Sequence, residues 1–138
     1  MVKFLSDKWI KKARDVVEKN LDAEQDMKNA TTSLLNIIEN VPPDKTTFYF
    51  YASFENGVLS ELYVNSDESL KDKEAEFTVT GDYITFMQIV KGEMSTVMAL
   101  LKNRVKLKGD KMKALRFAKP IDRINGALRK IETEFDEG

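Results

Sequence analysis

Apolar and polar residues alternate strictly along residues 46–54, which is the period of a half-buried β-strand. The pair Asn56-Gly57 follows, and it accepts the positive φ angles of a tight hairpin turn. Residues 58–64 alternate again and are predicted to return as the second strand of a hairpin. The first strand should carry Phe48, Phe50, Ala52 and Phe54 on one face and Tyr49, Tyr51 and Ser53 on the other. The second should carry Val58, Ser60, Leu62 and Val64 opposite Leu59, Glu61 and Tyr63.

Two more strands are predicted, one on each side of a helical region. Residues 76–80 alternate with Phe77 and Val79 inward, and residues 105–109 alternate with Val105 and Leu107 inward. Between them the pattern predicts helices over 83–91 and 95–103, and Asp82 is the expected N-cap of the first. Residues 65–73 are polar and should hold at most a short edge strand.

Helices are also predicted at both ends of the chain. Ser6 is the expected N-cap of a helix that runs to Asn20, and the last helices follow Asp110, with an interruption at Pro120. A further helical stretch is predicted from Asp22 until Val41-Pro42 ends it, weakened or broken at residues 31–33; it carries Met27, Leu34, Leu35, Ile37 and Ile38. The final helix has one apolar stripe, formed by Ile121, Ile124, Leu128, Ile131 and Phe135.

This order of elements predicts one α+β domain over residues 1–138. Strands cluster in the middle of the chain, so we expect a mixed, mostly antiparallel sheet of four to five strands covered by helices. A length of 138 residues with 42% apolar and 33% charged residues fits a single globular domain with one substantial core.

Composition removes several functional classes. The sequence contains no cysteine and no histidine, which excludes disulfides, thiol nucleophiles, a Ser-His-Asp triad and the usual zinc sites. We therefore expect no enzymatic activity, no metal and no cofactor. A net charge of −1 argues against a nucleic-acid partner. The first residues lack the apolar core of a signal peptide, and a cytoplasmic location is expected.

The helical region between residues 83 and 101 is more apolar than two short helices need to cover a sheet. It includes the flexible residues Met87, Met94 and Met98, which suit the adaptable lining of an apolar cavity. The same pattern also fits a filled core, which would make the chain a structural or protein-interaction module. An enzyme would have to rely on Asp82, Glu93 or Lys91, and no paired constellation supports that alternative.

Residues 75–82, Phe86, 90–94, 98–101 and 105–112, in this order, resemble the sterol-carrier-protein-type (non-specific lipid-transfer) domain family. Val105–Asp110 is similar to the family's last strand and turn, although Asp110 stands where asparagine is common. The resemblance implies a tunnel between sheet and helices for a sterol, fatty acid, fatty acyl-CoA or isoprenoid-like chain, bound non-covalently and transferred inside the cell.

The candidate site residues follow from these two arguments. The expected ligand-binding residues are Phe86, Ile89, Val90, Met94, Val97, Met98, Leu101, Met112, Leu115, Ile124 and Leu128. The final helix should form a wall or lid, able to swing because only its Pro120 end is attached.

Residues 102–119 are strongly basic in a chain of nearly zero net charge. Lys106, Lys108, Lys111 and Lys113 are the candidates for contact with an anionic headgroup or membrane surface. An ordinary solvated face is the alternative explanation. The pattern leaves the oligomeric state open.

Overall fold

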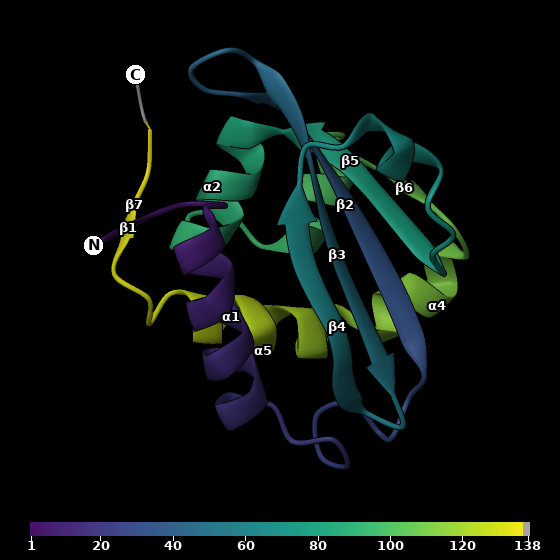
Figure 1. Cartoon of the computed structure of the whole chain (residues 1–138). Helices are drawn as coiled ribbons and strands as arrows, with labels where there is room; N and C mark the ends of the chain where they lie inside the picture. Colours follow the sequence, from purple (N-terminus) through teal and green to yellow (C-terminus); the bar gives the residue numbers. More distant parts are fainter. Residues whose placement is uncertain (137–138) are drawn as a thin grey trace.

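The computed structural model describes residues 1–136, which fold around a mixed five-stranded sheet (Figure 1). The strand order is β4-β3-β2-β5-β6, and β2 and β5 are parallel neighbours while the other neighbours are antiparallel. The predicted α+β class is therefore confirmed. The strands are β2 (Thr32–Val41), β3 (Thr46–Glu55), β4 (Val58–Asn65), β5 (Phe77–Asp82) and β6 (Val105–Lys108).

Helices α1, α2 and α5 lie together beside one face of this sheet (Figure 1). We call this the inner face. The helices are α1 (Asp7–Asn20), α2 (Tyr83–Lys91), α3 (Thr96–Leu101), α4 (Lys111–Arg116) and α5 (Ala118–Leu128). The side chains of Ser6, Asp82 and Asp110 accept hydrogen bonds from the first turns of α1, α2 and α4, as expected of N-caps. Gly92 ends α2 in the left-handed conformation, with φ of 85°.

The opposite, outer face of the sheet carries a smaller apolar cluster. Leu35, Tyr49 and Tyr51 are buried there, with Leu70 and Ala75 packed against them. Leu70 belongs to the short 3-10 helix η1 (Glu68–Asp72), so the polar segment that was expected to hold at most an edge strand instead covers this face.

The helix predicted to continue through residues 32–41 is wrong, because this segment is the central strand β2. Its apolar residues point to both faces: Leu35 on the outer face and Ile38 on the inner face are almost completely buried. A short apolar run that is buried on both sides has no period of two, and periodicity alone does not separate it from a buried helix.

The hairpin is confirmed at Asn56 and Gly57, which both have positive φ. Its second strand differs in one detail. A β-bulge shifts the register next to Phe54, so Leu59 pairs with Phe54 and lies on the same face as Leu62. The strict alternation predicted for residues 58–64 fails at this bulge.

The C-terminal region also differs from the prediction. The break between α4 and α5 falls at Phe117, and Pro120 lies in the first turn of α5, where proline is tolerated. Helix α5 ends at Leu128, so Ile131 and Phe135 are not on its stripe. Strand β7 (Thr133–Glu134) pairs instead with β1 (Val2–Lys3) in a small parallel ladder, which places the two ends of the chain side by side (Figure 1).

Candidate functional site

An apolar cavity of about 150 Å³ lies between the inner face of the sheet and the helices. Strands β2 to β6 form its floor, and α2, α3, α4 and α5 form the other walls. The core around Trp9 and Ala13, which have no exposed surface, is continuous with the cavity walls, and Val17 of α1 also lines the cavity.

The floor of the cavity is built from rows of residues that the strand register places side by side. One row joins Leu34 of β2, Ala52 of β3 and Leu62 of β4. The next row has Asn36 of β2 between Phe50 of β3 and Val79 of β5. Alternation along each strand keeps these side chains on the inner face. In the middle of the floor, Asn36 is the polar residue among apolar ones, and Thr32 and Ser33 at the start of β2 add polar groups at its end.

Seven of the eleven candidate ligand-binding residues line this cavity. They are Phe86, Ile89 and Val90 of α2, Val97 of α3, Leu115 of α4, and Ile124 and Leu128 of α5. Contact of these residues with a ligand stays a prediction. Leu115 lines the cavity and is also 43% exposed, so it marks a place where the cavity wall meets solvent.

The other four candidates, Met94, Met98, Leu101 and Met112, lie outside the cavity lining. Met94 packs against the main core, while Leu101 and Met112 are more than two-thirds exposed. On α3 the apolar residues that line the cavity are Val97 and Leu100, three positions apart, and the exposed pair Met98 and Leu101 has the same spacing. Both stripes are apolar, so the sequence pattern does not show which one faces inward.

The contribution of the central strand to the site was not predicted from the sequence pattern. Leu34, Asn36 and Ile38 line the cavity, but residues 32–41 were expected to form a helix. The alternation in residues 46–54 did carry a signal, because Phe50, Ala52 and Phe54 were placed on one face and all line the cavity.

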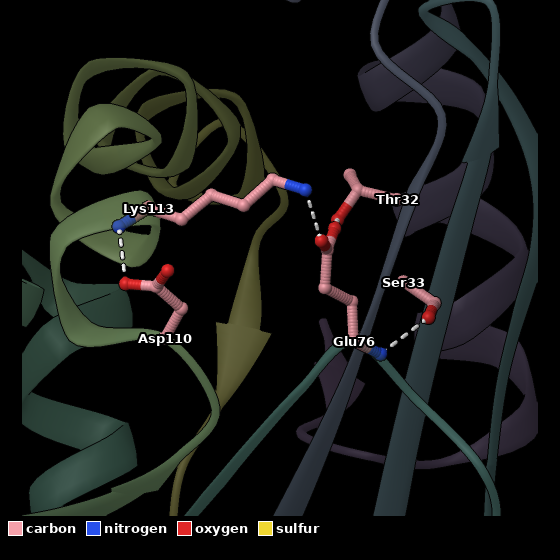
Figure 2. Close-up of polar contacts among 5 residues, drawn as sticks. All are labelled: Thr32, Ser33, Glu76, Asp110 and Lys113. Carbon is pink, nitrogen blue, oxygen red and sulfur yellow. Dashed lines mark hydrogen bonds and ion pairs between the residues drawn. The ribbon is translucent and has the colours of Figure 1, made fainter.

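One end of the cavity has polar neighbours (Figure 2). Thr32, which lines the cavity, donates its hydroxyl hydrogen to the carboxylate of Glu76, and Lys113 of α4 forms an ion pair with the same carboxylate. The backbone N–H of Glu76 donates to the Ser33 hydroxyl at 2.8 Å. Hydrogen bonds from Lys113 and then from Thr32 lower the pKa of Glu76, which keeps this group ionised. This network joins α4 to the start of β2 and β5.

The four candidate headgroup lysines do not form one cluster around the cavity. Lys106 and Lys108 are exposed on the edge strand β6, in register with Thr80 and Thr78, so they point to the outer face while Val105 and Leu107 line the cavity. Lys111 is exposed at the start of α4, and Lys113 is paired with Glu76. Contact of these lysines with an anionic surface stays a prediction.

The C-terminal end of α5 is attached to the rest of the fold, so the expectation that only its Pro120 end is attached is wrong. Just beyond the helix, Arg129 donates from Nε to the Val90 carbonyl at 2.9 Å and from a terminal nitrogen to the Ile89 carbonyl at 3.1 Å. The indole N–H of Trp9 donates to the Thr133 hydroxyl at 3.1 Å. Helix α5 therefore forms a wall of the cavity and is attached at both of its ends.

Within residues 1–136, no group of three or more aspartates or glutamates is placed to hold a metal ion. In the same part of the chain, no helix has the length and apolar character needed to cross a membrane. Among residues 1–136, Thr85 is the buried residue of polar type, and its hydroxyl accepts a hydrogen bond from Arg104.

Known proteins with this fold are similar over nearly the whole chain. A structure of sterol carrier protein 2 has a TM-score of 0.77 at 15% identity, with 94% of this chain and 99% of that chain covered. The palmitated sterol carrier protein 2-like 2 of Aedes aegypti has a TM-score of 0.55 at 17% identity, with 84% and 94% covered.

A third similarity is to part of a much larger protein. The sec-alkylsulfatase Pisa1 of a Pseudomonas species has a TM-score of 0.51 at 25% identity, with 75% of this chain and 15% of that chain covered. The comparison with curated proteins found no match. The model of the SCP-2 sterol transfer family matches residues 14–122. The chain belongs to this family.

Proposed function

We propose that this protein binds one long hydrophobic lipid in the apolar cavity, without a covalent bond, and transfers it between membranes. Membership of a sterol transfer family supports lipid binding and transfer in general. The single observation that carries the proposal is the cavity itself, which lies between sheet and helices and has almost entirely apolar walls. A fatty acid, a fatty acyl-CoA or an isoprenoid- or sterol-like chain would suit it. A filled core, as in a purely structural module, would leave no such space.

Burial of the lipid chain supplies the binding energy. Each methylene moved out of water contributes about 0.8 kcal/mol before the costs of association, so a long chain has ample driving force. Pockets for small-molecule ligands have volumes of about 300–1,000 Å³, however, and this cavity has about 150 Å³. Entry of a long chain therefore requires that one wall moves outward.

Helix α4 is the wall that is held most weakly. Every residue of α4 is exposed or half-buried. Its attachments to the sheet are the Lys113–Glu76 ion pair and, just after it, the edge-to-face contact of Phe117 with Phe77, whose ring centres are 5.9 Å apart. Segments with little buried surface open at low free-energy cost. We propose that α4 moves when the ligand enters, whereas α5 stays in place.

The outer side of α3 and α4 suits contact with a membrane. Met98, Leu101 and Met112 are exposed apolar side chains there. The segment between residues 102 and 119, which follows Leu101 and includes Met112, is basic. Exposed apolar side chains can insert among the lipids of an anionic membrane, and the neighbouring lysines attract its negative headgroups. Such contact would place Leu115, at the edge of the cavity, next to the membrane from which a ligand arrives.

Two measurements test the proposed function. Native mass spectrometry of freshly purified protein should detect a carried lipid by its added mass. In a displacement assay with a fluorescent fatty acid, unlabelled fatty acids, acyl-CoAs or isoprenoids should compete at micromolar concentrations. Failure of all three ligand classes to compete would refute lipid binding.

The similarity to a sec-alkylsulfatase favours a second candidate function. A domain of this fold forms part of that enzyme, so the chain could serve as an accessory module that presents an alkyl chain to an enzyme. In either case we propose that the chain itself catalyses no reaction and needs no metal. Steady turnover of an acyl thioester by the purified chain, or stoichiometric zinc or iron in elemental analysis, would contradict this.

A further inference from the structure

Asn36 is the one polar side chain in the middle of the cavity floor. It lies on β2, the central strand of the five, between the inner-face residues Leu34 and Ile38 of the same strand. Its neighbours across the sheet are Phe50 on β3 and Val79 on β5, which also line the cavity. An apolar residue at this position would complete the floor, so the amide calls for an explanation.

The orientation of this amide is fixed by the backbone. Its Nδ2 donates a hydrogen bond to the carbonyl oxygen of Phe50 at 3.2 Å. A carbonyl oxygen only accepts hydrogen bonds, so the nitrogen of the amide must face Phe50 and Oδ1 must face away from it. Among the residues that the structure describes, Oδ1 has no hydrogen-bond partner.

A free amide oxygen selects the chemistry of its ligand. In apolar surroundings it gains a hydrogen bond only from a donor, such as a hydroxyl group. An ionised carboxylate has no donor, and its oxygens would repel Oδ1. The amide nitrogen keeps a second hydrogen beside the one given to Phe50. A hydroxyl group both donates and accepts, so it can pair with Oδ1 or with this N–H, whereas a carboxylate can pair only with the N–H and leaves Oδ1 without a donor.

We propose that Asn36 determines ligand specificity by accepting a hydrogen bond from a hydroxyl group of the bound lipid. The ligand class is then a long-chain alcohol or another hydroxylated lipid, held with its hydroxyl at the middle of the floor. This inference rests on the proposed function, because it assigns a preference within the same cavity. It adds a polar contact to a site that otherwise recognises only length and shape.

The test compares hexadecanols with the hydroxyl on carbon 1, 4 or 8 against their methyl ethers, because an ether cannot donate a hydrogen bond. Several positions are needed, since the distance of Asn36 from the entrance decides which carbon reaches it. Affinities are measured by displacement of a fluorescent fatty acid from the wild type and from Asn36→Leu, with Asn36→Ala as a second variant if leucine disturbs folding. Asn125→Leu makes the same change at the other amide of the cavity lining.

We expect the wild-type protein to bind at least one of the alcohols about tenfold more tightly than the matching ether, because one net hydrogen bond contributes about this factor. Asn36→Leu or Asn36→Ala should abolish this ratio, and Asn125→Leu should keep it. Equal binding of every alcohol and ether by the wild type would overturn the inference and leave lipid binding intact. A ratio that survives in the Asn36 variants, or disappears only in Asn125→Leu, would also overturn it. Absence of any binding would refute the proposed function instead.

Discussion

At the scale of single residues, Ala52 keeps part of the cavity open. It lies on the inner face of β3 between the leucines Leu34 and Leu62, and its small side chain leaves space above the floor. We predict that Ala52→Leu fills this space and raises the free energy of unfolding by about 0.5–2 kcal/mol. The same change should weaken long-chain lipid binding about tenfold or more, because it displaces methylenes worth about 0.8 kcal/mol each. Chemical denaturation and the displacement assay measure the two effects.

Ser53 provides the matched control for this prediction. It is the next residue of the same strand and points to the opposite face, so Ser53→Leu adds a similar volume outside the cavity. Lipid affinity should stay unchanged in that variant. If Ala52→Leu bound long chains as tightly as the wild type does, the ligand would not occupy this part of the floor.

Arg129 stabilises the junction between two helices. Its guanidinium donates to the Val90 carbonyl and to the Ile89 carbonyl in the last turn of α2, and the Ile89 carbonyl also accepts from the Gly92 backbone N–H. We predict that Arg129→Met lowers the free energy of unfolding by about 1–2 kcal/mol, because two charge-assisted hydrogen bonds in a partly exposed position are lost. Arg129→Lys should retain only part of this stability, because an ammonium group lacks the planar guanidinium that reaches both carbonyls. Equal thermal denaturation temperatures for the three proteins would contradict this role.

Single residues were predictable from the sequence where a local rule decided them. The N-caps Ser6 and Asp82 and the turn at Gly57 follow from backbone chemistry within a few residues. The inward face of α3 did not follow, because Val97 and Met98 begin apolar stripes of equal spacing. Only tertiary packing, absent from a local pattern, decides between such stripes.

At the scale of elements, β2 shows the same limit more strongly. As the central strand it is buried on both faces, with Leu35 outside and Ile38 inside, and it therefore lacks the alternation that revealed β3. Strands β3 and β5 were predictable because their two faces differ in polarity along part of their length. The floor of the cavity was hidden from sequence analysis for this reason, while the helical walls were largely visible.

Helix α4 should respond to pH through Glu76. The folded-state pKa of Glu76 is depressed below its ordinary value of 4.5, mainly by the hydrogen bond from Lys113. The ion pair therefore stabilises the folded protein fully above that ordinary value, and the contribution disappears as pH falls through the depressed pKa. We predict that Glu76→Gln lowers the free energy of unfolding by at most about 1 kcal/mol at neutral pH, because the ion pair is partly exposed. In acid, where Glu76 is protonated, the same substitution should leave the free energy of unfolding unchanged.

Unfolding experiments at several pH values, with wild type and Glu76→Gln in parallel, measure this difference. Lys113→Met serves as a second variant, because loss of the ammonium should raise the pKa of Glu76, which nuclear magnetic resonance can follow. A difference between wild type and Glu76→Gln that did not change with pH would show that the ion pair does not hold α4.

At the scale of the whole molecule, charge is distributed unevenly along the fold. A basic segment between residues 102 and 119 includes the edge strand β6, and the acidic segment between residues 67 and 76 leads into β5, the neighbour of β6. The two segments meet in the ion pair of Glu76 with Lys113, which leaves most of the basic charge facing solvent. Exposed lysines on an edge strand also prevent pairing with another sheet, so Lys106 and Lys108 could serve this purpose alone.

A membrane-binding experiment distinguishes contact with an anionic membrane from protection of the sheet edge as the function of Lys106 and Lys108. We predict that reversing Lys106 and Lys108 together to glutamate weakens binding to anionic phosphatidylserine vesicles at low salt and changes little at high salt, because salt screens exposed charges. Reversal of Lys28 and Lys45, exposed in the loops on either side of β2, makes the same change in net charge and should have the smaller effect. Binding is measured by vesicle cosedimentation. If both double variants lost the same amount of vesicle binding, only net charge would matter. If reversal of Lys106 and Lys108 left low-salt binding unchanged, protection of the edge strand would remain as the function of these lysines.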